Sequence, residues 1–155
     1  MESKTFAFAF GMASGHINPS LPLARRLVAL GHKVHYLSRE QMRSAIEDTG
    51  ASFWNELEEE TELYEGREVD LMGATKALKE ELGAENDPMM VAFMKVGPRS
   101  LELQLPGCIR WLQKLQPSVV VYCPMMNQAR ITISKQEKGP STPNRLKNSR
   151  EPACS

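Results

Sequence analysis

Hydrophobic and polar positions near the start of the chain follow the pattern of a strand, a helix and a second strand. Residues 6–10 alternate Phe and Ala without a charge, which predicts a strand covered on both faces, as in a parallel sheet. Apolar residues then recur at helical spacing over residues 21–30, with Asn18 as the predicted N-cap and Gly31 as the predicted end of the helix. Residues 33–37 predict the next strand, so this stretch is one βαβ unit.

Two later segments extend the predicted sheet. Residues 39–49 predict a helix that Ser38 caps, and residues 51–54 predict a short strand after it. Residues 118–123 read Ser-Val-Val-Val-Tyr-Cys, a β-branched run typical of a central parallel strand. Because crossovers are right-handed, the second and third strands should lie on one side of the first strand and the fourth on the other. The sequence therefore predicts an α/β fold, a doubly wound parallel sheet of about four strands.

The middle of the chain changes character. Seven glutamates between positions 56 and 68 form an acidic run, which we interpret as a solvated loop and frayed helix rather than a metal or basic-partner site. A short helix is predicted within residues 71–82. Asp87 and Pro88 open a methionine-rich helix that is apolar nearly all round, so core packing is favoured over the lining of a pocket. Two Pro-Gly pairs, at residues 97–98 and 106–107, are expected to divide this helix into three pieces.

The net charge of the 155-residue chain is zero, which gives no support for nucleic acid or a membrane surface as a partner. Residues 1–126 carry 13 Lys and Arg against 17 Asp and Glu, whereas residues 127–155 carry 6 against 2. The second segment also lacks a sustained hydrophobic period and is rich in Ser, Pro and Asn. We therefore expect a folded domain over residues 1–126, which the resemblance described below implies is incomplete, and a disordered, basic tail over residues 127–155.

The cysteines, Cys108, Cys123 and Cys154, are widely spaced and form no CxxC pair, so neither a zinc site nor a disulfide framework is predicted. Reduced thiols are typical of the cytoplasm, which is the expected location. The first residues do not form a signal peptide, and no stretch approaches the ~20 apolar residues that cross a bilayer. No transmembrane segment is therefore expected.

The loop after the first strand does not match a nucleotide-binding motif. A dinucleotide-binding loop requires GxGxxG, but Ala13 stands where the second glycine should be. A Walker loop requires Lys and then Ser or Thr after its last glycine, whereas His16 and Ile17 follow Gly15. NAD or ATP binding by this loop is disfavoured.

His16 is the candidate for chemistry in this loop, which lies at the carboxyl edge of the predicted sheet. Neutral imidazole titrates near pH ~6.5 and accepts a proton from a hydroxyl group. The alternative is a histidine that only hydrogen-bonds the loop backbone. Cys123 ends the fourth strand and is expected near this loop, because both lie at the same edge.

The stretch of residues 11–38 resembles the N-terminal signature of UDP-sugar-dependent glycosyltransferases with the GT-B fold, in particular the macrolide-type and flavonoid-type enzymes. Their pattern is roughly G-H-x-x-P-x-L-x-L-A-x-x-L-x-x-x-G-H-x-V. It is matched by Gly15, His16, Pro19, Leu21, Leu23, Ala24, Leu27, Gly31, His32 and Val34. The resemblance implies the Rossmann-like, acceptor-binding half of such an enzyme.

The resemblance also implies a reaction: hexosyl transfer, with inversion, from a UDP-sugar to a hydroxyl of a small lipophilic acceptor. His16 would be the general base, and Cys123 stands where the family usually has the aspartate that orients this histidine. The acceptor would lie against Gly11, Ser14, Gly15, Ile17, Asn18, Met89 and Phe93. The UDP-sugar would be a co-substrate, and neither a metal nor a tightly bound cofactor is expected.

The family binds its nucleotide sugar mainly through a second domain, whose motifs do not occur in these 155 residues. We therefore expect a truncated chain whose family-like sequence stops near Met126 and which gives little or no turnover alone. A non-catalytic module that binds a small apolar ligand in the same cleft is one alternative. An unstable fragment, whose exposed sheet edge invites aggregation, is another.

Overall fold

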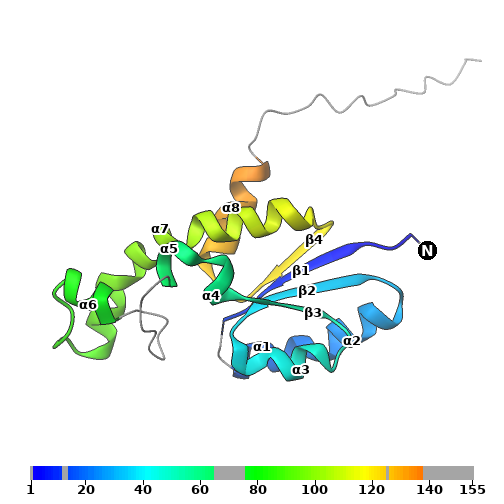
Figure 1. Cartoon of the computed structure of the whole chain (residues 1–155), viewed down its shortest axis with the longest axis horizontal. Helices are drawn as coiled ribbons and strands as arrows, with labels where there is room; N and C mark the ends of the chain where they lie inside the picture. Colours follow the sequence, from blue (N-terminus) through cyan, green and yellow to red (C-terminus); the bar gives the residue numbers. More distant parts are fainter. Residues whose placement is uncertain (1, 12–13, 65–75, 125, 138–155) are drawn as a thin grey trace, which may run out of the picture.

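A four-stranded parallel sheet forms the centre of the molecule. The computed structural model describes residues 2–11, 14–64, 76–124 and 126–137. The strand order is β3-β2-β1-β4 (Figure 1), with β1 at Thr5–Ala9, β2 at Lys33–Ser38, β3 at Ser52–Asn55 and β4 at Val119–Tyr122. Phe8 of β1 lies opposite Tyr36 of β2 and Val121 of β4. The predicted α/β class and the predicted places of the four strands are confirmed.

Helices cover both faces of this sheet. Figure 1 shows α2 (Leu21–Ala29) and α3 (Arg43–Glu47) on one face and α7 (Met89–Leu115) on the other. β1 is therefore enclosed, and Ala7, Phe8 and Ala9 are fully buried, as an uncharged central strand requires. The hydroxyl of buried Tyr36 shares a 2.8 Å hydrogen bond with Ser20 Oγ, so its polar end is satisfied.

The chain becomes helical before Asn18. The short helix α1 (Ser14–Ile17) and the 3-10 turn η1 (Asn18–Ser20) precede α2, and neither η1 nor α2 has a side-chain cap. The predicted N-cap role of Asn18 is wrong, because the residue already lies within helical backbone. The end of α2 is as predicted. Gly31 adopts φ +83°, and the N–H groups of Gly31 and His32 bond the carbonyls of Val28 and Leu27 in a Schellman cap.

The second helical segment also begins differently from its prediction. Ser38 is the last residue of β2 and pairs with Asn55 of β3, so it does not cap a helix. Its hydroxyl is buried and has no hydrogen-bond partner among the described residues. The segment then starts with the 3-10 turn η2 (Glu40–Met42), whose N-cap is Arg39, and continues as α3. Ser38 does not cap the helix because it is already paired with β3 as part of the sheet.

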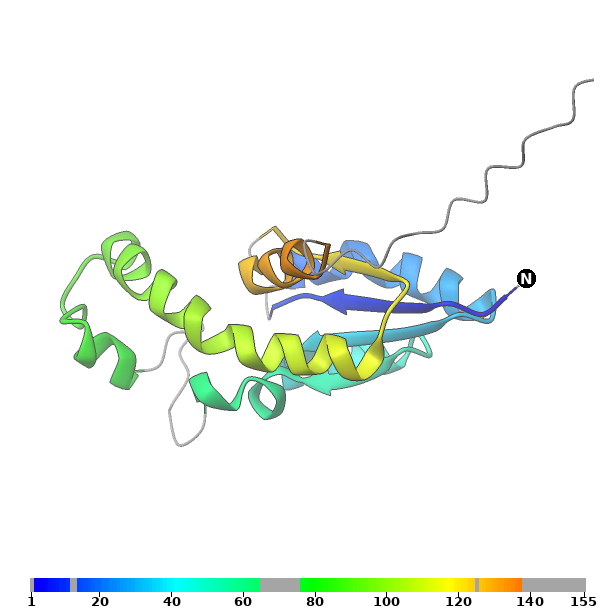
Figure 2. The ribbon, with the colours of Figure 1, turned by 90° about the horizontal axis from the view of Figure 1, so that it is seen from above.

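α7 is one helix of 27 residues, so the prediction of three pieces is wrong. Figure 2 shows it as a continuous ribbon that leads to β4. Pro98 and Pro106 lie inside it, and each removes one helical hydrogen bond. Cys108, Trp111 and Leu112, in its second half, are buried in the core against the sheet. This tertiary packing offsets the lost hydrogen bonds, which a local pattern cannot show.

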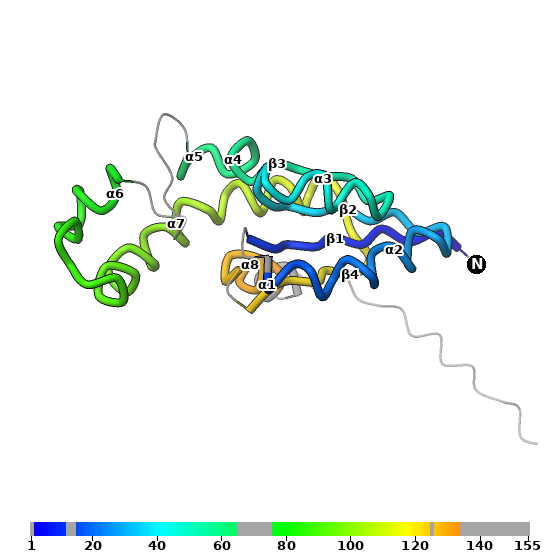
Figure 3. The backbone as a smooth tube through the Cα atoms, turned by 90° about the horizontal axis from the view of Figure 1, so that it is seen from below, coloured from blue at the N-terminus to red at the C-terminus, as the bar shows by residue number. Residues whose placement is uncertain are grey.

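The first turns of α7 extend beyond the sheet together with α6 (Lys76–Glu81), as Figure 3 shows. A second, small core forms there, in which Ala92 and Val96 pack with Leu78 of α6. Met90 and Met94 remain 64% and 74% exposed. The predicted burial of this methionine-rich segment is therefore wrong, because no sheet lies beneath it.

The acidic run forms two short helices, α4 (Glu56–Glu59) and α5 (Thr61–Tyr64). The interpretation as a solvated segment is wrong for Glu56 and Glu60, which are 3% and 0% exposed. Glu65, Glu68 and residues 71–75 of the predicted short helix lie outside the described residues.

Residues after Met126 do not lack structure throughout, as the predicted tail required. Asn127–Glu137 form α8, which contacts α7 (Figure 1). Ala129 is fully buried in the main core, and Thr132 is buried with its hydroxyl bonded to Gln128 O at 2.8 Å. Because α8 packs through small and polar side chains, its sequence has no strong apolar stripe. The helix was therefore not predicted. Residues 138–155 lie outside the described part. Among the residues that the structure describes, no helix is long and apolar enough to cross a membrane.

Candidate active site

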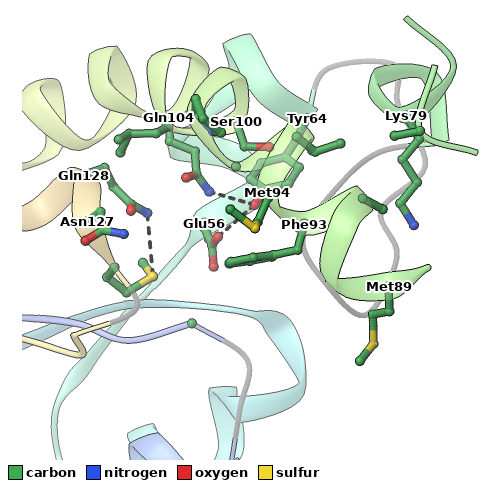
Figure 4. Close-up of a pocket in the computed structure, with 18 of the residues that line it drawn as sticks. Glu56, Tyr64, Lys79, Met89, Phe93, Met94, Ser100, Gln104, Asn127 and Gln128 are labelled. Atoms are coloured by element: carbon green, nitrogen blue, oxygen red, sulfur yellow. Dashed lines mark hydrogen bonds between the residues drawn. The ribbon is translucent and has the colours of Figure 1, made fainter. Parts of the chain in front are cut away.

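A cavity of about 850 Å³ lies at the carboxyl edge of the sheet. Each strand contributes a residue from the segment that follows it: Gly11 after β1, Arg39 after β2, Glu56 after β3 and Cys123 after β4. Open α/β sheets form their ligand sites at this edge. Figure 4 shows side chains from α5, α7 and α8 that complete the wall, among them Tyr64, Phe93, Met94, Gln104 and Gln128.

His16 and Cys123 meet in this wall. The His16 Nδ1 atom lies 2.9 Å from Cys123 Sγ. α1 holds the imidazole, so His16 lies within a helical turn and not in a loop ahead of a helix. The predicted proximity of the two residues is confirmed, and it follows from the shared edge of β1 and β4. His16 Nε2 makes no hydrogen bond to the described residues and remains available to a ligand.

The chemistry of this pair depends on which atom holds the proton. If the Cys123 thiol donates to Nδ1, then Nε2 carries the imidazole proton and cannot act as a base. If Nδ1–H donates to the sulfur, Nε2 is the free base and can accept a proton from a ligand hydroxyl. A carboxylate only accepts hydrogen bonds and would enforce the second tautomer. Sulfur is a weak acceptor and enforces it less strongly.

The structure brings some of the predicted site residues together and not others. Gly11, His16, Met89, Phe93 and Cys123 all line the cavity. The remaining predicted residues differ. Ile17 is fully buried in the hydrophobic core, and Gly15 and Asn18 are exposed and do not line the cavity. The side chain of Ser14 lies outside what the structure describes.

One wall of the cavity is apolar. It is formed mainly by α7, with Met89, Phe93, Met94, Val96 and Leu101. The favoured core role of the methionine-rich segment therefore gives way to the alternative, a pocket lining. Thioether and aromatic side chains adapt to ligands of different shape.

The cavity is also lined by a buried polar cluster of Arg39, Glu56 and Tyr64. Arg39 Nε donates to Glu56 Oε2 at 3.0 Å, and Arg39 Nη2 donates to Tyr64 Oη at 2.8 Å. The Tyr64 hydroxyl in turn donates to Glu56 Oε1 at 2.8 Å. Burial is the largest influence and opposes the charge on Arg39, but the charge and hydrogen bond of Glu56, together with its other neighbours, outweigh burial and raise the pKa of the guanidinium. Burial and the same carboxylate raise the pKa of Tyr64, which keeps its hydroxyl neutral.

Glu60 lies beside this cluster in the interior. Gln128 Nε2 donates to Glu60 Oε1 at 3.3 Å, while Glu60 Oε2 is buried without a partner among the described residues. Burial, reinforced by the charge of Glu56, raises the pKa of Glu60 well above its usual range. Burial therefore favours the neutral, protonated form of this side chain.

The prediction from sequence did not include Arg39, Glu56, Tyr64, Gln104 or Gln128 among the site residues. For two of them a signal existed, because Arg39 and Glu56 directly follow β2 and β3 and therefore lie at the carboxyl edge. Tyr64, Gln104 and Gln128 reach the cavity only through the packing of α5, α7 and α8. No group of three or more His, Cys, Asp or Glu side chains in the described ranges is arranged to hold a metal ion.

No profile of a known protein family matches the chain. A curated relative, the 4'-demethylrebeccamycin synthase of Lentzea aerocolonigenes, is 43% identical over 37 residues. These residues make up 24% of this chain and 9% of that protein.

Solved structures of glycosyltransferases share the fold. CalG4, the calicheamicin glycosyltransferase, aligns with a TM-score of 0.60 at 17% identity, over 88% of this chain and 31% of its own. The glycosyltransferase of kitacinnamycin aligns with a TM-score of 0.61 at 21% identity, over 88% of this chain and 29% of its own. SnogD from Streptomyces nogalater aligns with a TM-score of 0.53 at 22% identity, over 82% of this chain and 30% of its own. The chain therefore has the fold of part of a GT-B glycosyltransferase, which confirms the predicted resemblance. It spans about a third of the length of these structures.

Proposed function

We propose that this chain binds the acceptor in a glycosyltransferase reaction. In this reaction a hexosyl group passes, with inversion, from a UDP-sugar to a hydroxyl of a small lipophilic molecule. The observation that carries the proposal is the place of His16 in an 850 Å³ cavity with an apolar wall, at the carboxyl edge of a glycosyltransferase-like sheet. A related fold, SsfS6, has been solved in complex with thymidine diphosphate, which supports a nucleotide sugar as donor.

In the proposed step, His16 Nε2 takes the proton of the acceptor hydroxyl. The acceptor oxygen then forms a bond to the anomeric carbon of the sugar, and the bond from that carbon to the diphosphate oxygen breaks. The electron pair leaves with the nucleoside diphosphate, and the proton stays on the imidazole. Because the new bond forms opposite the breaking bond, the configuration at the anomeric carbon inverts.

Cys123 acts in this scheme through His16. As acceptor of the Nδ1–H hydrogen bond at 2.9 Å, its sulfur holds the tautomer in which Nε2 is a base. The apolar wall binds the body of the acceptor. Met89, Phe93 and Met94 supply this surface.

A transfer assay with a matched control tests the proposal. UDP-glucose and para-cumylphenol are incubated with the wild type, with His16→Ala and with His32→Ala, and the glucoside is measured by mass spectrometry. His32 accepts a hydrogen bond from the Lys4 N–H at the amino end of the sheet and does not line the cavity, which makes it a suitable control. Because little turnover is expected from this chain alone, we expect a small but measurable amount of product from the wild type and from His32→Ala, and its loss in His16→Ala with phenol binding retained. Equal product from His16→Ala would exclude the base role, and binding without product from any variant would favour a non-catalytic binding module.

A further inference from the structure

The cluster of Arg39, Glu56 and Tyr64 is not needed for the proposed chemistry, yet it lines the same cavity as His16. Arg39 and Glu56 are 6% and 3% exposed. Removing two charges from water costs several kcal/mol per ion, and apolar replacements of such pairs are often neutral or stabilising. Stability alone therefore gives little reason for an ion pair at this place.

The cluster also retains unused hydrogen-bonding capacity. Arg39 has five N–H groups. Two of them bond to described residues, one from Nε to Glu56 and one from Nη2 to Tyr64. Because Arg39 lines the cavity, the remaining donors lie where a ligand can reach them. Gln104 also lines the cavity, and its amide nitrogen lies 3.4 Å from the Tyr64 hydroxyl.

The charges of the cluster are balanced, with one guanidinium against one carboxylate. Burial raises the pKa of both Tyr64 and Glu60 and so favours the neutral form of each. A charged ligand group would leave one charge without a counterpart in a poorly solvated place, whereas a neutral oxygen would not.

We propose that Arg39, Glu56 and Tyr64 form a second recognition site, which binds an uncharged hydroxyl or carbonyl oxygen at the end of the acceptor remote from His16. This inference rests on the proposed function and makes it more specific. His16 and Cys123 lie at the ends of β1 and β4, whereas Arg39 and Glu56 lie at the ends of β2 and β3. Since neighbouring strands are about 4.8 Å apart, the two pairs lie on the order of 10 Å from each other along the edge. The preferred acceptor is thus an apolar body with an oxygen at each end.

Two phenols that differ by one hydroxyl test this specificity. Bisphenol A has a hydroxyl at each end of an apolar body, and para-cumylphenol is the same molecule without one of them. Binding is measured by calorimetry without a donor sugar, so the result does not depend on turnover. The wild type should bind bisphenol A about tenfold more tightly, well beyond the twofold that symmetry gives, as one hydrogen bond to a charged group allows.

The variant Arg39→Met/Glu56→Met removes both charges at similar volume and leaves no unpaired charge, while the Tyr64 hydroxyl keeps Gln104 as a partner. It should bind the two phenols with affinities within about twofold of each other, the symmetry factor alone. The control Arg43→Met/Glu40→Met removes an exposed ion pair outside the cavity and should keep the tenfold preference. Circular dichroism and urea unfolding show whether each variant retains the fold.

A wild type that binds neither phenol, or binds both equally apart from symmetry, would overturn the second site. A preference that persists in Arg39→Met/Glu56→Met would overturn it as well. Failure of the proposed function gives a different result. In that case transfer would not depend on His16, while the tenfold preference and its loss in the double variant would remain.

Discussion

The imidazole Nδ1 of His16 lies 2.9 Å from the sulfur of Cys123, although the two residues are 107 positions apart along the chain. The parallel pairing of β1 with β4 brings them together, because each residue follows one of these strands at the same edge. A thiol is a weaker hydrogen-bond acceptor than a carboxylate. The contact therefore positions the imidazole but fixes its tautomer incompletely.

Replacing the thiol with a carboxylate should improve the site. In Cys123→Asp the carboxylate accepts the Nδ1–H bond, favours the base form at Nε2 and stabilises the imidazolium that forms during transfer. We expect glucoside formation from UDP-glucose to rise by about tenfold or more. Cys123→Ser, which supplies a hydroxyl that can also donate, is the control and should show no such gain. An equal rate in Cys123→Asp and the wild type would show that the contact does not limit the base.

Two exposed methionines of α7 differ in whether they line the cavity, which allows a matched test of ligand binding. Met94 is 74% exposed and lines the cavity, whereas Met90 is 64% exposed and does not. Met94→Gln should weaken binding of para-cumylphenol about tenfold, because the phenol loses apolar contact area. Met90→Gln should leave the affinity unchanged by calorimetry. Equal weakening in both variants would place the ligand outside the cavity.

Gly107 is expected to be essential for the packing of α7. A Cβ added there would lie 2.7 Å from the Glu60 Cα atom and even closer to the backbone of Glu59, so the link between α4 and α5 would have to move. Gly107→Ala should lower the free energy of unfolding by roughly 1–3 kcal/mol in urea titrations. Gly97→Ala, in the same helix with open space around it, is the control and should change it by less than about 1 kcal/mol. Similar values for both would contradict the close contact at Gly107.

Glu60 should make the stability of the fold depend on pH. Its folded-state pKa is raised, so its stabilising contribution is complete below the ordinary glutamate pKa and is lost as the pH rises toward the folded-state value. Glu60→Gln should therefore flatten the decline of the unfolding free energy between about pH 5 and pH 7, a decline of up to about 1.4 kcal/mol per unit. Urea titrations across this range measure it.

Glu62 provides the control for this effect. Its hydrogen bonds with Arg110 lower its pKa to about 2, so its contribution is lost only as the pH falls below the ordinary glutamate value. Glu62→Gln should leave the slope between about pH 5 and pH 7 unchanged. An unchanged slope in Glu60→Gln would mean that Glu60 is ionised in the folded protein.

The sequence was sufficient to predict the sheet because its strands have local signatures. The Phe-Ala alternation of β1 and the Val run of β4 identify buried parallel strands, and their order follows from the handedness of crossovers. The same logic predicted that His16 and Cys123 meet. The intact α7 could not be predicted, since the packing of Trp111 and Leu112 against the sheet outweighs two prolines.

The polar cluster of Arg39, Glu56 and Tyr64 was not predicted, for a related reason. A glutamate in an acidic run is usually solvated, and nothing local to Glu56 shows that Arg39 and Tyr64 will surround it. Their contacts join the residue that follows β2 with residues of α4 and α5, and exist only in the folded chain. The position of Arg39 and Glu56 directly after strands was the one signal that sequence reasoning could have used.

Nitrogen NMR of labelled histidine side chains shows whether His16 Nε2 is a free base, with the His16 signals assigned by their loss in His16→Ala. We expect para-cumylphenol to shift the Nε2 signal of His16, because the phenol O–H donates a hydrogen bond to this atom, while Nδ1 remains protonated toward Cys123. The methyl ether of the same phenol has no proton to donate and should leave Nε2 nearly unshifted. Equal shifts with both ligands, or a protonated Nε2 throughout, would contradict a base at this position.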